Sequence, residues 1–152
     1  MLDVKIKRLS ETATIPTYGS AKAAGMDLYA DLGAEDNGCK KFICIRPHTT
    51  VKISTGFAFQ PPEGYCALIL ARSGLATKQG LAPANKVGLC DEDYRGAYIV
   101  AIHNHSEQEQ AIAHGDRIAQ LMFVPYEQAN LVVVDELEST DRGDGGFGSS
   151  GK

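Results

Sequence analysis

A polar turn between two apolar stretches holds the residues best suited to chemistry. The segment begins at Asn85 with alternating apolar residues, reverses into Asp91-Glu-Asp-Tyr94, and is followed by an apolar run at 97–101. This pattern predicts a β-hairpin whose tip carries carboxylates and an aromatic ring. A carboxylate such as Asp91 can take a proton from water, and a ring can stack against a small planar ligand. A solvated turn without a chemical role fits the same residues, because acids are common in turns.

A second candidate site lies where an apolar run meets a short helix. Arg72, Ser73 and Gly74 follow the apolar run 65–70, and we expect a helix over 73–79. Free backbone N–H groups and the positive end of the helix dipole attract anions at such a junction. Arg72 adds a guanidinium that can bind phosphate, and Ser73 adds a hydroxyl donor. The junction predicts a phosphate site, but it is not a Walker loop, because the chain contains neither GxxxxGKS nor GxxxxGKT.

Several polar residues stand within apolar surroundings. Asp27 has apolar neighbours on both sides and is interpreted either as an edge acid that faces water or as part of a site. Gln120 lies inside an apolar run, where a buried amide needs a hydrogen-bond partner. For Arg117 we favour a structural ion pair with an acid. His103 and His105 are imidazoles of the kind that bind metals, but no third ligand is near in sequence, so we do not expect a metal there.

The chain ends in a glycine-rich tail. The last ten residues include five glycines, which predicts a segment that packs no core of its own. Arg142 and Phe147 are unusual in a plain linker. They indicate a mobile arm that closes over a ligand with a charge and a ring. Together with the turn and the phosphate junction, the tail predicts a nucleotide site covered by a lid.

Length and composition place these residues on one globular domain. The chain has 152 residues, of which 43% are hydrophobic and 22% charged, as is ordinary for a soluble protein. A net charge of −4 argues against binding along a nucleic-acid backbone. No apolar run approaches the roughly 20 residues of a membrane helix, and no signal peptide is expected. The four cysteines form no CxxC pair, so we expect no disulfide framework or zinc site, and a cytoplasmic location.

Short apolar runs separated by Gly, Pro and Asp recur along the chain, and few windows show a helical period. Strands are expected at 4–9, 43–45, 51–54, 56–59, 65–70, 99–102, 117–124 and 131–134. Many short strands predict an all-β fold, a distorted jelly roll or β-barrel with one short helix. We expect residues 1–138 to form this domain, with an exposed loop at 31–42, and residues 139–152 to form the flexible arm.

Five segments in order give the chain a resemblance to a known family. It resembles the homotrimeric dUTP pyrophosphatases (dUTPases), which have a β-clip fold and cut dUTP into dUMP and pyrophosphate. That activity limits uracil in DNA and supplies dUMP for dTMP synthesis. The five segments are Ala24–Ala30, Arg72–Ala76, Asn85–Gly96, Gly115–Leu121 and Arg142–Ser149.

The resemblance implies a role for each matching residue. Asp91 resembles the carboxylate that activates the attacking water, and Tyr94 resembles the ring beneath deoxyribose. Asp27 matches an acid that contacts Mg²⁺ through water. The other implied substrate contacts are Arg72, Ser73, Gly74, Asn85, Gly88, Gln120, Arg142, Phe147, Gly148 and Ser149. The resemblance also implies Mg²⁺ as the cofactor, dUTP as the substrate, and a homotrimer with active sites at its subunit interfaces.

Two rival functions use the same type of fold. A dCTP deaminase typically carries a Glu beside the phosphate-binding helix, and the segment Leu75–Gln79 has none. A non-catalytic trimer that binds nucleotides for regulation would be expected to lose Asp91 or the arm, and both are present. Because fold alone does not fix function, these rivals are separated by the chemistry of the site.

Overall fold

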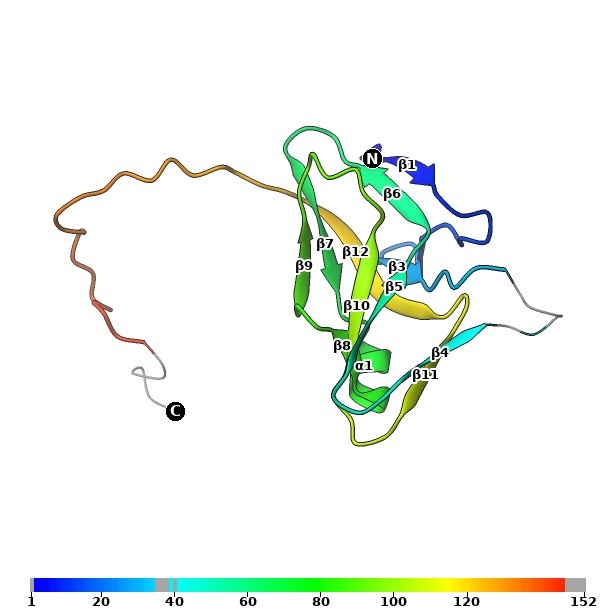
Figure 1. Cartoon of the computed structure of the whole chain (residues 1–152). Helices are drawn as coiled ribbons and strands as arrows, with labels where there is room; N and C mark the ends of the chain where they lie inside the picture. The colour runs from blue at the N-terminus through cyan, green and yellow to red at the C-terminus, as the bar shows by residue number, and fades with distance from the viewer. Residues whose placement is uncertain (1, 35–38, 40, 147–152) are drawn as a thin grey trace.

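The largest sheet of the molecule has five antiparallel strands. The computed structural model describes residues 2–34, 39 and 41–146, which contain twelve strands and one helix (Figure 1). The order of the five strands is β2-β3-β12-β7-β9. Their bounds are β2 Thr17–Tyr18, β3 Met26–Tyr29, β12 Arg117–Pro125, β7 Tyr65–Leu70 and β9 Val87–Cys90.

Three smaller sheets complete the fold. One has three strands in the order β5-β10-β8, and the others are the pairs β1-β6 and β11-β4. Their bounds are β5 Thr50–Ser54, β10 Ile99–Asn104, β8 Leu81–Pro83, β1 Lys5–Arg8, β6 Phe57–Gln60, β11 Gln110–Ala113 and β4 Phe42–Ile45. The all-β prediction is confirmed as a jelly-roll-like fold, and the sheets formed by the described residues do not close into a barrel.

The core lies between these sheets. Val100 and Ile102 are buried at alternate positions of β10, as expected for a strand with one inward face. Leu28, Ile69 and Leu121 join the same cluster from three neighbouring strands of the large sheet. Burying a side chain of this size stabilises the fold by about 1.5–3 kcal/mol. The core therefore fixes the strands that carry the candidate site residues.

Helix α1 (Ser73–Gln79) begins directly after β7 and has the bounds expected from the sequence. Leu75 anchors it in the core. Its end is set by Gly80, whose φ of 69° suits glycine and whose N–H bonds to carbonyls of the last turn. Arg72 is the extended N-cap residue. The junction between β7 and α1 thus holds Arg72 and Ser73 at the surface end of a buried strand.

The predicted hairpin at 85–101 is wrong in one respect, because its two strands do not pair with each other. β9 pairs with β7, whereas β10 pairs with β5 and β8. The N–H of Ala84, just before this segment, donates to the carbonyl of Ala101 (2.8 Å) and so continues the pairing of β8 with β10. Each strand has a better partner in its own sheet, so the two separate. Residues 91–96, here called the acidic turn, carry the chain from one sheet to the other.

The strand expected at 131–134 is also wrong. After β12 ends at Pro125, residues 126–146 form no helix or strand and extend away from the body (Figure 1). Val133 and Leu137 are 98% and 88% exposed. An apolar strand needs a partner strand, and none of the described residues pairs with this segment. Phe147, Gly148 and Ser149 lie outside the described residues, as do 35–38 and 40 of the predicted loop.

Candidate active site

Asp27 is the centre of a cluster of polar side chains on the large sheet. It is 4% exposed. Its Oδ1 accepts hydrogen bonds from Arg72 Nε (3.3 Å) and Gln120 Nε2 (3.5 Å), and its Oδ2 accepts one from Arg117 Nη1 (3.2 Å). The expected ion pair of Arg117 with an acid is therefore confirmed. The amide of Gln120 also has the partner that its place in the strand required.

Strand register explains why these residues meet. Asp27 of β3 lies opposite Gln120 of β12, and Gln120 lies opposite Leu70 of β7. Arg72 follows Leu70 by two residues, which brings its guanidinium to the same row. The two guanidiniums and one carboxylate leave a net positive charge, and a cavity of 230 Å³ lies beside Arg72 and Arg117. Such a cluster is suited to binding phosphate.

We predict that Asp27→Ala destabilises the protein, because it leaves two guanidiniums without their shared partner. Arg72 and Arg117 are partly exposed, so the expected loss of unfolding free energy is about 2–3 kcal/mol, at or just below the range of about 3–5 kcal/mol for a fully buried pair. Urea unfolding at a fixed protein concentration measures this loss. Asp27→Asn is the matched control, since it keeps the shape and one acceptor and is expected to lose less. A change below about 0.5 kcal/mol for Asp27→Ala would show that the cluster is not structural.

The free edge of β9 offers main-chain groups to a ligand. β9 is the last strand of its sheet, and within the described residues it pairs only with β7. Gly88, opposite Ile69 on β7, has no room for a side chain: a Cβ would lie 3.2 Å from Ile69 Cβ and 3.3 Å from Asn85 Nδ2. Asn85 is exposed at the start of the strand. Asn85 and Gly88, both predicted to bind substrate, are therefore brought together.

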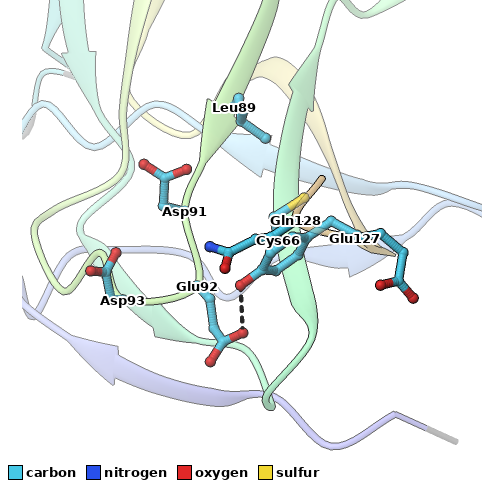
Figure 2. A pocket seen from close by; sticks show the side chains of 8 residues that line it. Cys66, Leu89, Asp91, Glu92, Asp93, Glu127 and Gln128 are labelled. Atoms are coloured by element: carbon cyan, nitrogen blue, oxygen red, sulfur yellow. Dashed lines mark hydrogen bonds between the residues drawn. The ribbon is translucent and has the colours of Figure 1, made fainter. Parts of the chain in front are cut away.

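The acidic turn borders a cavity of about 620 Å³. Figure 2 shows Asp91 and Asp93 on one side of it and Glu127 on the other. The cavity is lined by Cys66, Leu89, Asp91, Glu92, Asp93, Tyr126, Glu127 and Gln128. Asp91 is exposed and accepts no hydrogen bond from a described side chain, so its carboxylate is available to water.

Tyr94 is held by its own turn. Its N–H donates to the carbonyl of Asp91 (3.2 Å) and its hydroxyl donates to the carbonyl of Ala97 (3.0 Å). Gly96 lets the ring fold back, because a Cβ there would collide with the Tyr94 hydroxyl oxygen. The ring is 43% exposed. Asp91 and Tyr94 thus form a compact pair, with one open carboxylate and one partly open ring.

Two titratable side chains lie behind the acidic turn. Burial raises the pKa of the Cys90 thiol, and burial also raises the pKa of Tyr98. The Tyr98 hydroxyl is buried without a hydrogen-bond partner in the described structure, and its ring lies 5.9 Å from that of Tyr94. A thiol with a raised pKa is a poor nucleophile at neutral pH. Cys90 and Tyr98 are accordingly neutral supports for the turn.

Of the remaining predicted residues, Arg142 has no hydrogen bond to these groups, whereas Ser73 and Gly74 directly follow Arg72. Arg142 is exposed on the tail, where its Nε donates to the carbonyl of Gly145 (2.9 Å). His103 and His105 have ring centres 4.4 Å apart, but no group of three or more metal-binding side chains occurs among the residues that the structure describes. Ser73 and Gly74 lie at the start of α1, with Ser73 exposed.

The site residues fall into two groups at opposite ends of β9. Val87 lies opposite Leu70 near the Asp27 cluster, whereas Asp91 follows Cys90, which lies opposite Ala67. Figure 1 shows helix α1 and the turn that leads from β9 to β10 at opposite ends of the molecule. At about 3.3 Å per residue, Arg72 and Asp91 are separated by roughly 20 Å along the strands. One chain therefore carries the Asp27 cluster and the acidic turn at two separate places.

Comparison with known proteins places the chain in a family. A sequence model of the dUTPase family matches residues 11–151. The chain belongs to the dUTPase family. It is 41% identical over 150 residues to the deoxyuridine 5'-triphosphate nucleotidohydrolase of Syntrophotalea carbinolica, with 99% of this chain and 97% of the relative covered. The enzyme of that name from Desulfotalea psychrophila is 46% identical over 144 residues, with coverage of 95% and 91%.

Solved dUTPases share the fold. The dUTPase of Staphylococcus bacteriophage 80alpha, solved with dUPNHPP, aligns with a TM-score of 0.81, 28% identity and 99% coverage of both chains. A point mutant of the dUTPase from phage phi11 of S. aureus aligns with a TM-score of 0.77 and 25% identity, covering 90% of this chain and 99% of that one. Its description names a structural Mg(II) ion. The relatives and neighbours thus match this dUTPase-family chain over nearly its whole length.

Two residues beside Asp91 were missed from the sequence, whereas the ion pair of Arg117 with an acid was expected. Glu92 and Tyr126 are linked by a hydrogen bond of 2.8 Å beside Asp91. Tyr126 lies outside the five family segments, and no local pattern distinguishes it, so only the fold reveals this contact.

Proposed function

We propose that this dUTPase-family chain hydrolyses dUTP to dUMP and pyrophosphate, with water attacking the α-phosphorus. The observation that carries the proposal is the open carboxylate of Asp91 beside Tyr94 on a large cavity. The full-length match to dUTP nucleotidohydrolases supports it, and those relatives do not favour a deaminase. Helix α1 also has no acid in its first turn, where a deaminase-type Glu would be expected.

Asp91 is proposed as the general base and Tyr94 as the sugar platform. An exposed carboxylate can orient a water and take its proton as the water attacks phosphorus. The ring of Tyr94 offers a flat surface on which deoxyribose can lie, and the bond to Ala97 keeps that ring in place. A ribose 2'-hydroxyl would meet this ring, which favours deoxyribonucleotides.

Uracil recognition is assigned to Asn85, Gly88 and the free edge of β9. The main-chain groups on this edge have no strand partner, so they can bind the polar edge of a pyrimidine. Because Gly88 has no side chain, a pyrimidine can reach these main-chain groups. A closely fitted edge rejects the thymine methyl by a clash and the cytosine amino group by an unsatisfied donor.

The phosphates are proposed to bind Arg72, Ser73, Gly74 and Gln120, with Mg²⁺ as the cofactor. Magnesium usually keeps several waters and is held largely by substrate phosphates, so a protein cage is not required. Bound in that way, it would neutralise charge on the phosphates. Both Asp27 oxygens are engaged by Arg72, Arg117 and Gln120. Its proposed contact is therefore through water, as expected for an outer-shell ligand.

Three copies of the chain are proposed to complete each other's sites. The wide separation of Arg72 and Asp91 supports this, because a general base that acts on the water attacking the α-phosphorus must lie much closer than roughly 20 Å to the residues that bind the phosphates. Two exposed apolar surfaces also favour association with other copies. One is the run 131–137 on the tail, and the other is a groove of about 370 Å³ on the body. The groove is lined by Leu2, Val4, Ile6, Ile15, Pro16, Tyr18, Ala24, Met26, Phe59 and Phe123. Sedimentation equilibrium should give three times the chain mass of 16.3 kDa.

The tail is proposed as a closing arm, with residues 1–138 as the catalytic domain and 139–152 as the arm. Arg142, Phe147, Gly148 and Ser149 would contact a substrate bound between other copies. The extended path of the described tail supports this division, because the segment after β12 leads away from the body of its own chain (Figure 1). No described helix is long and apolar enough to cross a membrane. The four free cysteines support a reducing, cytoplasmic location.

The proposed function is tested by mixing the protein with dUTP, dCTP, dTTP and UTP in separate reactions with Mg²⁺. The expected products are dUMP and pyrophosphate from dUTP alone. Ammonia released from dCTP would instead show a deaminase. If no nucleotide is consumed, the result would instead favour a non-catalytic protein that binds nucleotides for regulation.

A further inference from the structure

A closed triangle of hydrogen bonds joins three separate segments beside the acidic turn. Glu92 Oε2 accepts bonds from the N–H of Gly64 (2.7 Å) and the hydroxyl of Tyr126 (2.8 Å). The N–H of Tyr126 donates to the carbonyl of Gly64 (3.1 Å), which closes the triangle. Figure 2 shows the side-chain bond of Glu92 on the wall of the cavity that Asp91 lines.

The three residues of the triangle lie in different segments of the chain. Gly64 lies in the turn between β6 and β7 and has a φ of 77°, which favours glycine. Glu92 immediately follows Asp91. Tyr126 is the first residue after β12 and therefore the first residue of the tail. The triangle thus joins the turn that carries the proposed base to the start of the extended segment that leads to the proposed arm.

The chemistry of Glu92 differs from that of its acidic neighbours. Asp91 and Asp93 are exposed, whereas Glu92 is half-buried and its carboxylate is held by two short bonds. Bonds to an ionised acceptor are stronger than neutral ones. The main chain is fixed as well, because the Arg95 guanidinium donates to the carbonyls of Glu92 and Tyr94. The bond to Glu92 also raises the pKa of Tyr126, which keeps its hydroxyl protonated as a donor.

We infer that Glu92 and Tyr126 are positioning residues that hold the Asp91–Tyr94 pair and the root of the tail in a fixed relation. Without the Tyr126 hydroxyl, Glu92 keeps one donor and can swing toward Asp91, where its negative charge disturbs the general base. The first bend of the tail also loses an anchor. This inference rests on the proposed hydrolysis of dUTP, since it concerns the rate of that reaction.

The test compares Tyr126→Phe, Glu92→Ala, Glu92→Gln and the double variant Tyr126→Phe/Glu92→Ala by single-turnover hydrolysis of dUTP. Tyr126→Phe removes one oxygen and is expected to slow the chemical step about three- to tenfold. Binding of a non-hydrolysable imido analogue of dUTP should change less than about twofold, because neither residue is assigned a substrate contact. The double variant should be no slower than Glu92→Ala, since both changes break the same bond.

Conservative rescue and a matched control separate positioning from general destabilisation. Glu92→Gln keeps an oxygen acceptor and is expected to retain more of the rate than Glu92→Ala. Tyr65→Phe removes the hydroxyl of a half-buried tyrosine on β7, one whose hydroxyl has no hydrogen bond to a described residue, and should match the wild type. A wild-type rate for Tyr126→Phe, or additive losses in the double variant, would overturn the inference. An inactive wild-type protein would instead overturn the proposed function.

Discussion

Asp91→Asn is expected to bind the imido analogue of dUTP about as well as the wild type and to hydrolyse dUTP about 10³-fold more slowly. An amide preserves the size and hydrogen bonding of the side chain but cannot take a proton from water. General base catalysis typically contributes 10²- to 10⁴-fold. Steady-state kinetics and equilibrium titration with the analogue measure the two quantities separately.

The neighbouring acid provides the matched control for this substitution. Asp93 is exposed on the same turn and lines the same cavity, but no role is assigned to it. Asp93→Asn removes the same charge two residues away and is expected to stay within about threefold of the wild-type rate. Equal losses for both variants would mean that the net charge of the turn matters and that Asp91 is not the base. Undiminished turnover by Asp91→Asn would remove it from that role directly.

Deleting residues 141–152 is expected to leave a folded protein with little activity. The described part of this segment is exposed and contributes nothing to the core, so thermal unfolding should change little. Loss of Arg142 and Phe147 removes a charge and a ring from the closing arm, and we expect turnover to fall by at least about 10²-fold. Loss of folding on deletion would show that the tail is structural.

Mixing two inactive variants tests whether the arm serves another copy. Asp91→Asn keeps the arm, and the deletion variant keeps Asp91. If each site combines Asp91 of one chain with the arm of another, co-refolded mixtures regain activity that neither variant has alone. A mixture that forms the same oligomer as the wild type but stays inactive would place both elements in one chain's site.

The sequence predicts local structure well where a residue's neighbours in the chain decide it. Helix α1 and most core strands follow from apolar runs and from a glycine that ends the helix. The ion pair of Arg117 was expected because an arginine in an apolar run needs an acid. The identity of that acid, Asp27, depends on the register of β3 against β12, which no local pattern fixes.

The two wrong strand predictions share a physical cause. Residues 87–90 and 97–101 have the alternation of a hairpin, but each strand finds a better partner in a different sheet. Residues 131–134 have the composition of a strand, but this single chain provides no partner. Strand formation depends on pairing as well as on composition, so both outcomes are decided by residues distant in sequence. The Glu92–Tyr126 contact was missed for the same reason.

The central claim is that water attacks the α-phosphorus of dUTP, and hydrolysis in ¹⁸O-labelled water tests it most directly. Mass spectrometry of the products should find the label in dUMP and none in pyrophosphate, because the attacking oxygen stays on the phosphorus that it attacks. Label in pyrophosphate would mean attack on the β-phosphorus. That result would contradict the proposed position of the water beside Asp91.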